Sequence, residues 1–201
     1  MAYEFTAGDL ALDFVNTLER HDGPAPEEVL ASWADLVDWA ARAGVAAPQV
    51  ASALRRLEAR DPRAAQAVFR RARQLRDCLY ELLAALLAER PPAAGDLRRF
   101  GAFLAEAQAA VLVRAAPGGL ALDLPVSAGR PASLLGPVVT AAARLLTSPE
   151  TVALIRRCDA ENCRQFFVDR SRNRSRRWCD MRLCGNRAKA RAFYRQHRGR
   201  S

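Results

Sequence analysis

The feature that most constrains this chain is the spacing of four cysteines near its C-terminal end. They form two C-x4-C pairs separated by fifteen residues, namely Cys158 with Cys163 and Cys179 with Cys184. Four thiolates brought together in this way can surround one ion, and zinc favours four tetrahedral ligands of this kind. Because four thiolates leave no open position for water, the pattern predicts a structural zinc site rather than a catalytic one.

Three other interpretations of the cysteines remain open, namely disulfides, unligated core cysteines and an iron–sulfur cluster. The opening MAYEFTAGDL has no basic segment followed by an apolar run, and no stretch reaches the ~18 apolar residues of a membrane span. We therefore expect a cytoplasmic protein with no membrane partner, in which thiols stay reduced and paired cysteines more often bind metal. The fifth cysteine, Cys78, lies in an apolar helical pattern and is expected to be a small core residue.

Positive charge is concentrated in the same segment as the cysteine pairs. Residues 154–201 carry 15 basic and four acidic residues, whereas residues 1–153 carry 16 basic and 18 acidic ones. The net charge of +9 therefore comes from the C-terminal segment alone. A block of this density is typical of a protein that binds a polyanion, and nucleic acid is the favoured partner. A solvated basic tail and a contact with an anionic membrane are the alternatives.

The loop between the cysteine pairs and the last helix supply candidate contacts to nucleic acid. Arginine side chains can bind phosphates, and an asparagine can add a neutral hydrogen bond to the backbone. In the last helix, Arg187, Arg191 and Arg195 are four residues apart and share one face. The candidate nucleic-acid-binding residues are Arg172, Asn173, Arg174, Arg176, Arg177, Arg187, Lys189, Arg191 and Arg195.

The residues around the cysteines predict a small treble-clef-like module over residues 151–201. Strand character before Cys158 and over residues 165–168 places the first cysteine pair in the turn of a hairpin, and the second pair leads into a helix. A module of this size needs an apolar centre, which we expect from Trp178 with Phe166, Phe167 and Phe193. Asp169 is expected to bond a nearby arginine and so to hold the loop.

The first 150 residues predict a separate, helical domain. Apolar residues recur with helical periodicity, and around Pro117-Gly118-Gly119 the period changes to two, which predicts one β-hairpin. The helices are expected to begin near Leu10, Glu27, Val50, Pro62, Asp96 and Ser133. The predicted fold class is therefore mainly α, with a multi-helix domain, one small hairpin, and a C-terminal zinc module of a short hairpin and a helix.

Asp13 and Asn16 are polar residues within an apolar helix. They could line a pocket for a small-molecule effector, or they could make side-chain bonds that tie helix ends and turns. No nucleophile–base constellation or glycine-rich phosphate loop stands out, so we do not expect an enzyme. An enzyme or ligand sensor with an N-terminal pocket, an RNA-binding zinc protein and a homodimer remain open.

The C-terminal motif resembles the CGNR zinc-finger family. The resemblance is carried by Cys158, Cys163, Phe167, Asp169, Ser171, Asn173 and the continuous core RRWC-x-M-x-x-CGNR at residues 176–187. It implies that the four cysteines are zinc ligands and that the finger binds DNA. The opening GDLALDFVNTLE resembles the start of the ABATE domain, which precedes this finger in bacterial proteins and is described as a stress-induced transcription regulator. Together the two resemblances imply a bacterial transcription regulator.

Overall fold

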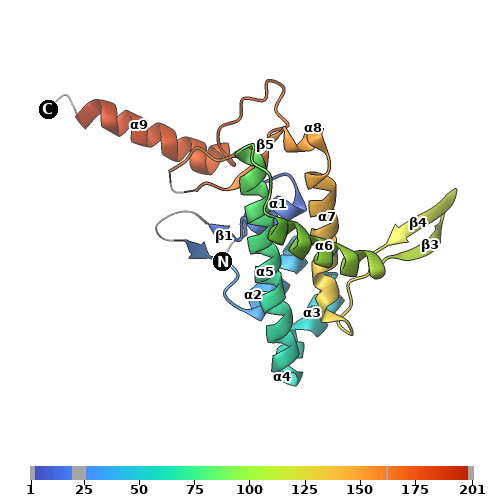
Figure 1. Ribbon diagram of the computed structural model, residues 1–201. Coiled ribbons are helices and arrows are strands. Elements are labelled where there is room, and N and C mark those ends of the chain that lie inside the picture. The colour runs from blue at the N-terminus through green and yellow to red at the C-terminus, as the bar shows by residue number, and fades with distance from the viewer. Residues whose placement is uncertain (1–2, 20–25, 162, 199–201) are drawn as a thin grey trace.

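The computed structural model describes residues 3–19, 26–161 and 163–198, and in the last helix the side chains of residues 192 and 195–198 also lie outside the description. Helices dominate the described chain, and each of its sheets has two strands (Figure 1). The predicted mainly α class is confirmed. No helix in the described part of the chain is both long and apolar enough to cross a membrane.

The N-terminal part is built around one long helix, α5 (Pro62–Leu87). The Asp61 side chain accepts the backbone N–H of Ala64, and Pro62 occupies the first turn, where a missing N–H costs nothing. Helices α1, α2 and α6 contact α5, and α7 packs on α1 and α6. The other helices of this part are α1 (Leu10–Val15), α2 (Trp33–Arg42), α3 (Pro48–Arg55), α4 (Leu57–Arg60), α6 (Ala94–Ala109), η1 (Pro131–Leu135), α7 (Gly136–Leu146) and α8 (Pro149–Val152).

The expected start of the second helix near Glu27 is wrong. The chain there forms a short antiparallel pair, β1 (Leu18–Glu19) with β2 (Glu27–Glu28), and α2 begins only at Trp33. The reason is a tertiary contact: both carboxylate oxygens of Glu28 accept hydrogen bonds of 2.6 Å from the Arg76 guanidinium, which is only 1% exposed. A buried arginine needs such a partner, and extended backbone brings Glu28 to it.

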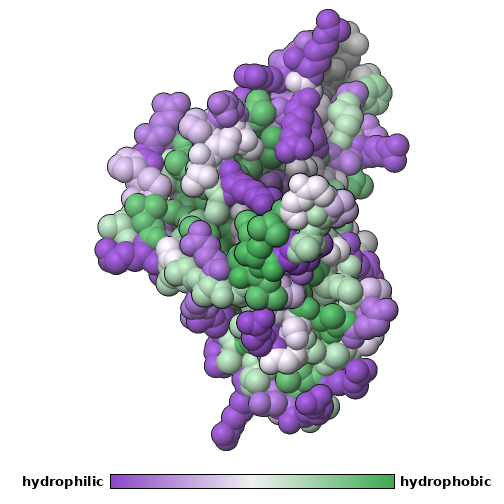
Figure 2. All heavy atoms as spheres, turned by 90° about the vertical axis from the view of Figure 1, so that its right-hand side faces the viewer, coloured by the Kyte–Doolittle hydropathy of each residue, from purple (hydrophilic) through white to green (hydrophobic). Residues whose placement is uncertain are grey.

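The predicted hairpin is confirmed as β3 (Leu112–Ala116) and β4 (Gly119–Asp123), and it projects from the body (Figure 1). Its register pairs Val113 with Leu122, which puts their side chains on one face of the hairpin. Both remain exposed, by 63% and 76%. Figure 2 looks onto the side of the molecule from which the hairpin projects and shows apolar side chains gathered among hydrophilic ones.

The C-terminal part begins with a second hairpin, β5 (Ile155–Arg157) and β6 (Phe166–Val168). A short helical segment, η2 (Met181–Gly185), leads directly into α9 (Asn186–Arg198). This is the hairpin and helix that the sequence predicted. Helix α9 extends away from the rest of the molecule (Figure 1).

The two parts share one continuous core. The N–H of Val168 in β6 donates to the carbonyl oxygen of Ala7 (2.8 Å), and β6 contacts α1. The ring of Phe166 lies 5.6 Å, centroid to centroid, from that of Tyr80 in α5. The cysteine module is therefore packed against the helical domain, and a division at residue 150 remains a prediction from sequence.

Candidate metal centre and nucleic-acid interface

The four C-terminal cysteines converge in space. The sulfur atoms of Cys158, Cys163, Cys179 and Cys184 all lie within 4.8 Å of one another, and all four residues are buried. Cys163 and Cys179 are 3.4 Å apart, and Cys179 and Cys184 are 3.7 Å apart, sulfur to sulfur. A tetrahedral site with zinc–sulfur bonds of about 2.3 Å has sulfur–sulfur edges of about 3.8 Å. The donor set and its spacing therefore fit a zinc ion.

Local backbone geometry produces the first half of this cluster. Cys158 directly follows β5, and its N–H donates to the carbonyl oxygen of Gln165 (2.9 Å). The N–H of Cys163 donates to Ala160 (3.0 Å), and Arg164 adopts a positive φ of 61°, so the chain turns sharply back into β6. The expectation that the first pair sits in a hairpin turn is confirmed.

The thiols alter one another's ionisation. The hydrogen bond from Cys163, together with one from Cys179 and the backbone amides of Cys179 and Ala160, lowers the pKa of Cys158. The same bonds to Cys158 raise the pKa of Cys163 and of Cys179, and burial raises that of Cys184. The cluster alone favours one thiolate beside three thiols, so four thiolates in this space require a cation among them.

Asp169 organises the loop that links the two cysteine pairs. It is fully buried, and one carboxylate oxygen accepts the N–H and the hydroxyl of Ser171 (2.9 and 2.5 Å). The other oxygen accepts the backbone N–H of Arg176 (2.9 Å). Burial acts to raise the pKa of Asp169, but these hydrogen bonds outweigh it and the pKa lies below its ordinary value. Asp169 thus bonds an arginine, as expected, but it accepts from the backbone N–H of Arg176 and not from a guanidinium.

The guanidinium of Arg176 is directed inward. It lies 4.6 Å from the centre of the Phe167 ring and donates to the carbonyl oxygens of Trp178 (2.8 Å), Cys179 and Thr6 (3.3 Å). These contacts bind the loop to the second cysteine pair and to the N-terminal segment. Nε and Nη2 of Arg176 are thus used within the protein, which argues against a contact between this side chain and nucleic acid; that contact stays a prediction from sequence.

The other predicted contact residues fall into two groups. Arg177 is ion-paired with Asp159 (2.8 Å) and Arg191 with Glu161 (3.2 Å), all partly or largely exposed. A second group is exposed, and among the described residues its side chains make no hydrogen bond or ion pair. Its members are Arg172, Asn173, Arg174, Arg187 and Lys189. The side chain of Arg195 lies outside the described part of the chain.

The apolar centre of the module differs from the expected one. Phe166 and Phe167 are buried and Trp178 packs partly buried against them, but Phe193 is 57% exposed. Phe193 lies on the projecting part of α9, beyond the reach of the core. At Gly185 a Cβ atom would meet the Met181 side chain and come within 3.3 Å of the Trp178 ring, so any larger residue at this position of the CGNR motif requires these side chains to shift.

The expected effector pocket at Asp13 and Asn16 is not supported. Asp13 accepts the N–H of Ala7 (3.0 Å), and Asn16 bonds the backbone of Phe166. The hollow beside them holds about 20 Å³, which suffices for a single water molecule. In the structure, both side chains tie chain segments together, which is the other alternative that the sequence offered. The sequence offered this role for Asn16 but not its partner Phe166, because the only signal was a polar residue in an apolar helix.

The fold and the site define a helical protein that ends in a four-cysteine finger. Residues 8–149 match the ABATE family, whose description is "Putative stress-induced transcription regulator", and residues 155–197 match the CGNR zinc finger. The chain therefore belongs to the ABATE family and carries a C-terminal CGNR zinc finger, as the two motifs indicated. No curated protein matches the chain.

Proposed function

We propose that this protein is a DNA-binding transcription regulator whose C-terminal module is shaped by one structural zinc ion. The observation that carries the proposal is the convergence of four buried cysteine sulfurs at the base of an arginine-rich loop and a basic helix. Zinc bound by Cys158, Cys163, Cys179 and Cys184 would join the hairpin to α9 and supply folding energy to the module. The family description supports the regulatory role.

Charge on the surface of the module supports a polyanionic partner. Four of the predicted contact residues are exposed basic side chains that make no ion pair with any described residue: Arg172, Arg174, Arg187 and Lys189. Arg177 and Arg191 can exchange their exposed carboxylate partners for phosphates at little cost, because surface ion pairs are weak. Helix α9 contains no acidic residue, so nothing on it opposes the approach of a phosphate backbone.

The shape of α9 favours duplex DNA over RNA. An α-helix with its side chains is about 10–12 Å wide, which matches the roughly 12 Å width of the B-DNA major groove. The major groove of A-form RNA is deep and too narrow to admit a helix. Helix α9 extends away from the rest of the molecule (Figure 1), which leaves it accessible to a groove.

The test is a binding titration of the full-length protein with a 30-base-pair DNA duplex and with an RNA duplex of the same sequence. The whole chain is needed because the module shares its core with the helical domain. With four phosphate contacts, log K against log salt should have a slope of about −3.6, a loss of roughly 100-fold between 50 and 200 mM salt. Removal of metal with a chelator should abolish binding, and added zinc should restore it.

Three results would count against the proposal. Absence of binding to either duplex at 50 mM salt would remove the nucleic-acid role. Equal affinity for the two duplexes would remove the preference for DNA. Binding that persists with the same salt slope after complete metal removal would show that the zinc site does not shape the surface.

A further inference from the structure

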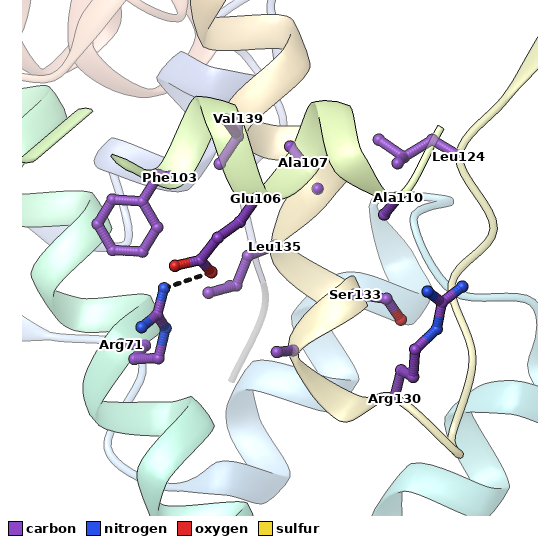
Figure 3. Close-up of a pocket in the computed structure, with 12 residues that line it drawn as sticks. Arg71, Phe103, Glu106, Ala107, Ala110, Leu124, Arg130, Ser133, Leu135 and Val139 are labelled. Carbon is purple, nitrogen blue, oxygen red and sulfur yellow. Dashed lines mark hydrogen bonds and ion pairs between the residues drawn. The ribbon is translucent and has the colours of Figure 1, made fainter. Parts of the chain in front are cut away.

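A cavity of about 190 Å³ opens between α5, α6 and the η1–α7 segment, away from the cysteine module. It shares no lining residue with the hollow beside Asp13 and Asn16, and it is almost ten times larger than that hollow. Figure 3 shows Phe103, Arg71 and Glu106 at one end of it and Arg130 with Ser133 at the other. All residues that line it belong to the helical domain.

The walls of the cavity are mainly apolar. Phe103 and Ala107 come from α6, Leu135 and Val139 from η1 and α7, and Leu124 follows β4. At Gly136 a Cβ atom would lie 3.0 Å from the Leu124 side chain, so the glycine lets Leu124 close one wall. A cavity of about 150 Å³ with such walls accepts benzene, so this one has room for an apolar body of one ring or a short branched chain.

Three charged residues lie at the rim, and only two of them, Arg71 and Glu106, form an ion pair. Arg71 donates to Glu106 (2.6 Å) and lies 5.1 Å from the centre of the Phe103 ring, so its charge is already balanced. The Arg130 guanidinium makes no hydrogen bond or ion pair with any residue that the structure describes. The rim therefore carries one uncompensated positive charge next to an apolar hollow. That combination suits a ligand with an anionic end and an apolar body.

We propose that this cavity binds a small monocarboxylate, with its apolar body between α6 and α7 and its carboxylate on Arg130. Arginine presents two parallel N–H donors that match the two oxygens of a carboxylate. Arg130 is exposed, so pairing it with a carboxylate requires little desolvation. The site would give the regulator a place to sense a metabolite, and it needs no residue of the DNA-binding surface.

The experiment uses three probes of equal shape and different charge: 3-phenylpropanoate, its neutral amide, and 3-phenylpropylamine. Binding to the full-length protein is measured by calorimetry and by saturation-transfer NMR. A ligand of this size is expected to bind with a Kd of about 0.1–1 mM. The carboxylate should bind about ten-fold more tightly than the amide, and the amine should not bind detectably.

Variants locate the site. Arg130→Gln should reduce carboxylate affinity about ten-fold and leave the amide unchanged, whereas Arg98→Gln, an exposed arginine of α6 outside the cavity, should change neither. Ala110→Phe, at the partly exposed end of α6, should fill the cavity and remove binding of both probes while the circular dichroism spectrum stays the same. If Ala110→Phe unfolds the protein, Ala132→Phe serves the same purpose from an exposed position in η1.

Any of four results would overturn the proposal: no binding of the carboxylate, equal binding of the amide, full affinity in Arg130→Gln, or full affinity in the filled variant. None of them bears on the DNA-binding proposal, because the cavity and the cysteine module have no residue in common. Likewise, a failed DNA titration would not change what the ligand measurement says about the cavity.

Discussion

The side-chain amide of Asn16 bonds both backbone groups of Phe166, which lies 150 residues further along the chain. Its nitrogen donates to the Phe166 carbonyl oxygen (2.8 Å), and its oxygen accepts the Phe166 N–H (2.9 Å). Asn16 thus satisfies the backbone groups on the edge of β6 that does not pair with β5. On the same edge, the N–H of Val168 donates to the carbonyl oxygen of Ala7. The first helix is in this way tied to the hairpin that carries the first cysteine pair.

Replacement of Asn16 by alanine should destabilise the full-length protein by about 2–4 kcal/mol, because it leaves a buried N–H and a buried carbonyl without partners. Urea unfolding followed by circular dichroism measures the free energy of unfolding. Asn173→Ala, which alters an exposed loop residue, is the control and should stay within about 0.5 kcal/mol of the native protein. Equal effects of the two substitutions would mean that the Asn16 bonds contribute nothing.

Substitution of Cys184 by serine should remove bound zinc and melt the module, because three thiolates and a hydroxyl hold zinc far more weakly than four thiolates. Zinc per chain, measured by mass spectrometry on dialysed protein, should fall from about one to near zero. The matched control is Cys78→Ala, because Cys78 is also buried but lies outside the cluster. Loss of metal in the Cys78 variant would contradict the assignment of the ligands.

Arg174 and Arg176 should behave differently although they are two residues apart. Arg174→Ala removes an exposed charge, so DNA affinity should fall and the salt slope should flatten by about 0.9, while the melting temperature stays the same. Arg176→Lys keeps the charge but cannot reproduce the planar contacts to Phe167 and the loop carbonyls. We expect it to cost about 1–3 kcal/mol of stability.

Two measurements on both variants distinguish these arginines: thermal unfolding, and DNA titrations at four salt concentrations. A melting temperature that is unchanged in Arg176→Lys, or that falls in Arg174→Ala, would reverse the roles that the contacts indicate.

Burial raises the pKa of Asp13 to about 6, against an ordinary value near 3.9. The folded protein thus favours the neutral carboxyl: this stabilisation is complete below about pH 4 and is lost as the pH rises through about 6. Asp13→Asn should therefore be more stable than the native protein at pH 7, by about 1–2 kcal/mol after allowance for partial solvent exposure, and equally stable at pH 4.

Denaturant unfolding at pH 4, 5 and 7 checks the Asp13 prediction, with the exposed Glu58→Gln as the control that should show no trend. Because both proteins carry the same metal site, the difference between them isolates residue 13. A difference that is the same at pH 4 and pH 7 would show that folding does not raise the pKa of Asp13.

The local elements could be predicted because each depends on neighbours in the chain. At the start of α5, Asp61 accepts a backbone N–H of the first turn and Pro62 lacks one that would need a partner. Pro117 and Gly118 form the turn between β3 and β4. The spacing within each cysteine pair was enough to indicate a common site, since each pair is brought together by a short turn. Glu28 is the exception among these elements, because its extended conformation depends on an arginine 48 residues away.

By itself, the sequence determined most of the helices, the hairpins β3–β4 and β5–β6, the cysteine cluster and the position of the positive charge, because periodicity, turn residues and composition act over a few residues. Only the tertiary structure decided which polar side chains face inward. Asn16 bonds the backbone of Phe166 in β6, the Arg176 guanidinium bonds loop carbonyls, and Arg130 lies unpaired, among the described residues, at a cavity. Each of these positions depends on contacts between segments that are distant in the sequence. A buried donor needs an acceptor, but the local sequence does not show which segment will supply it.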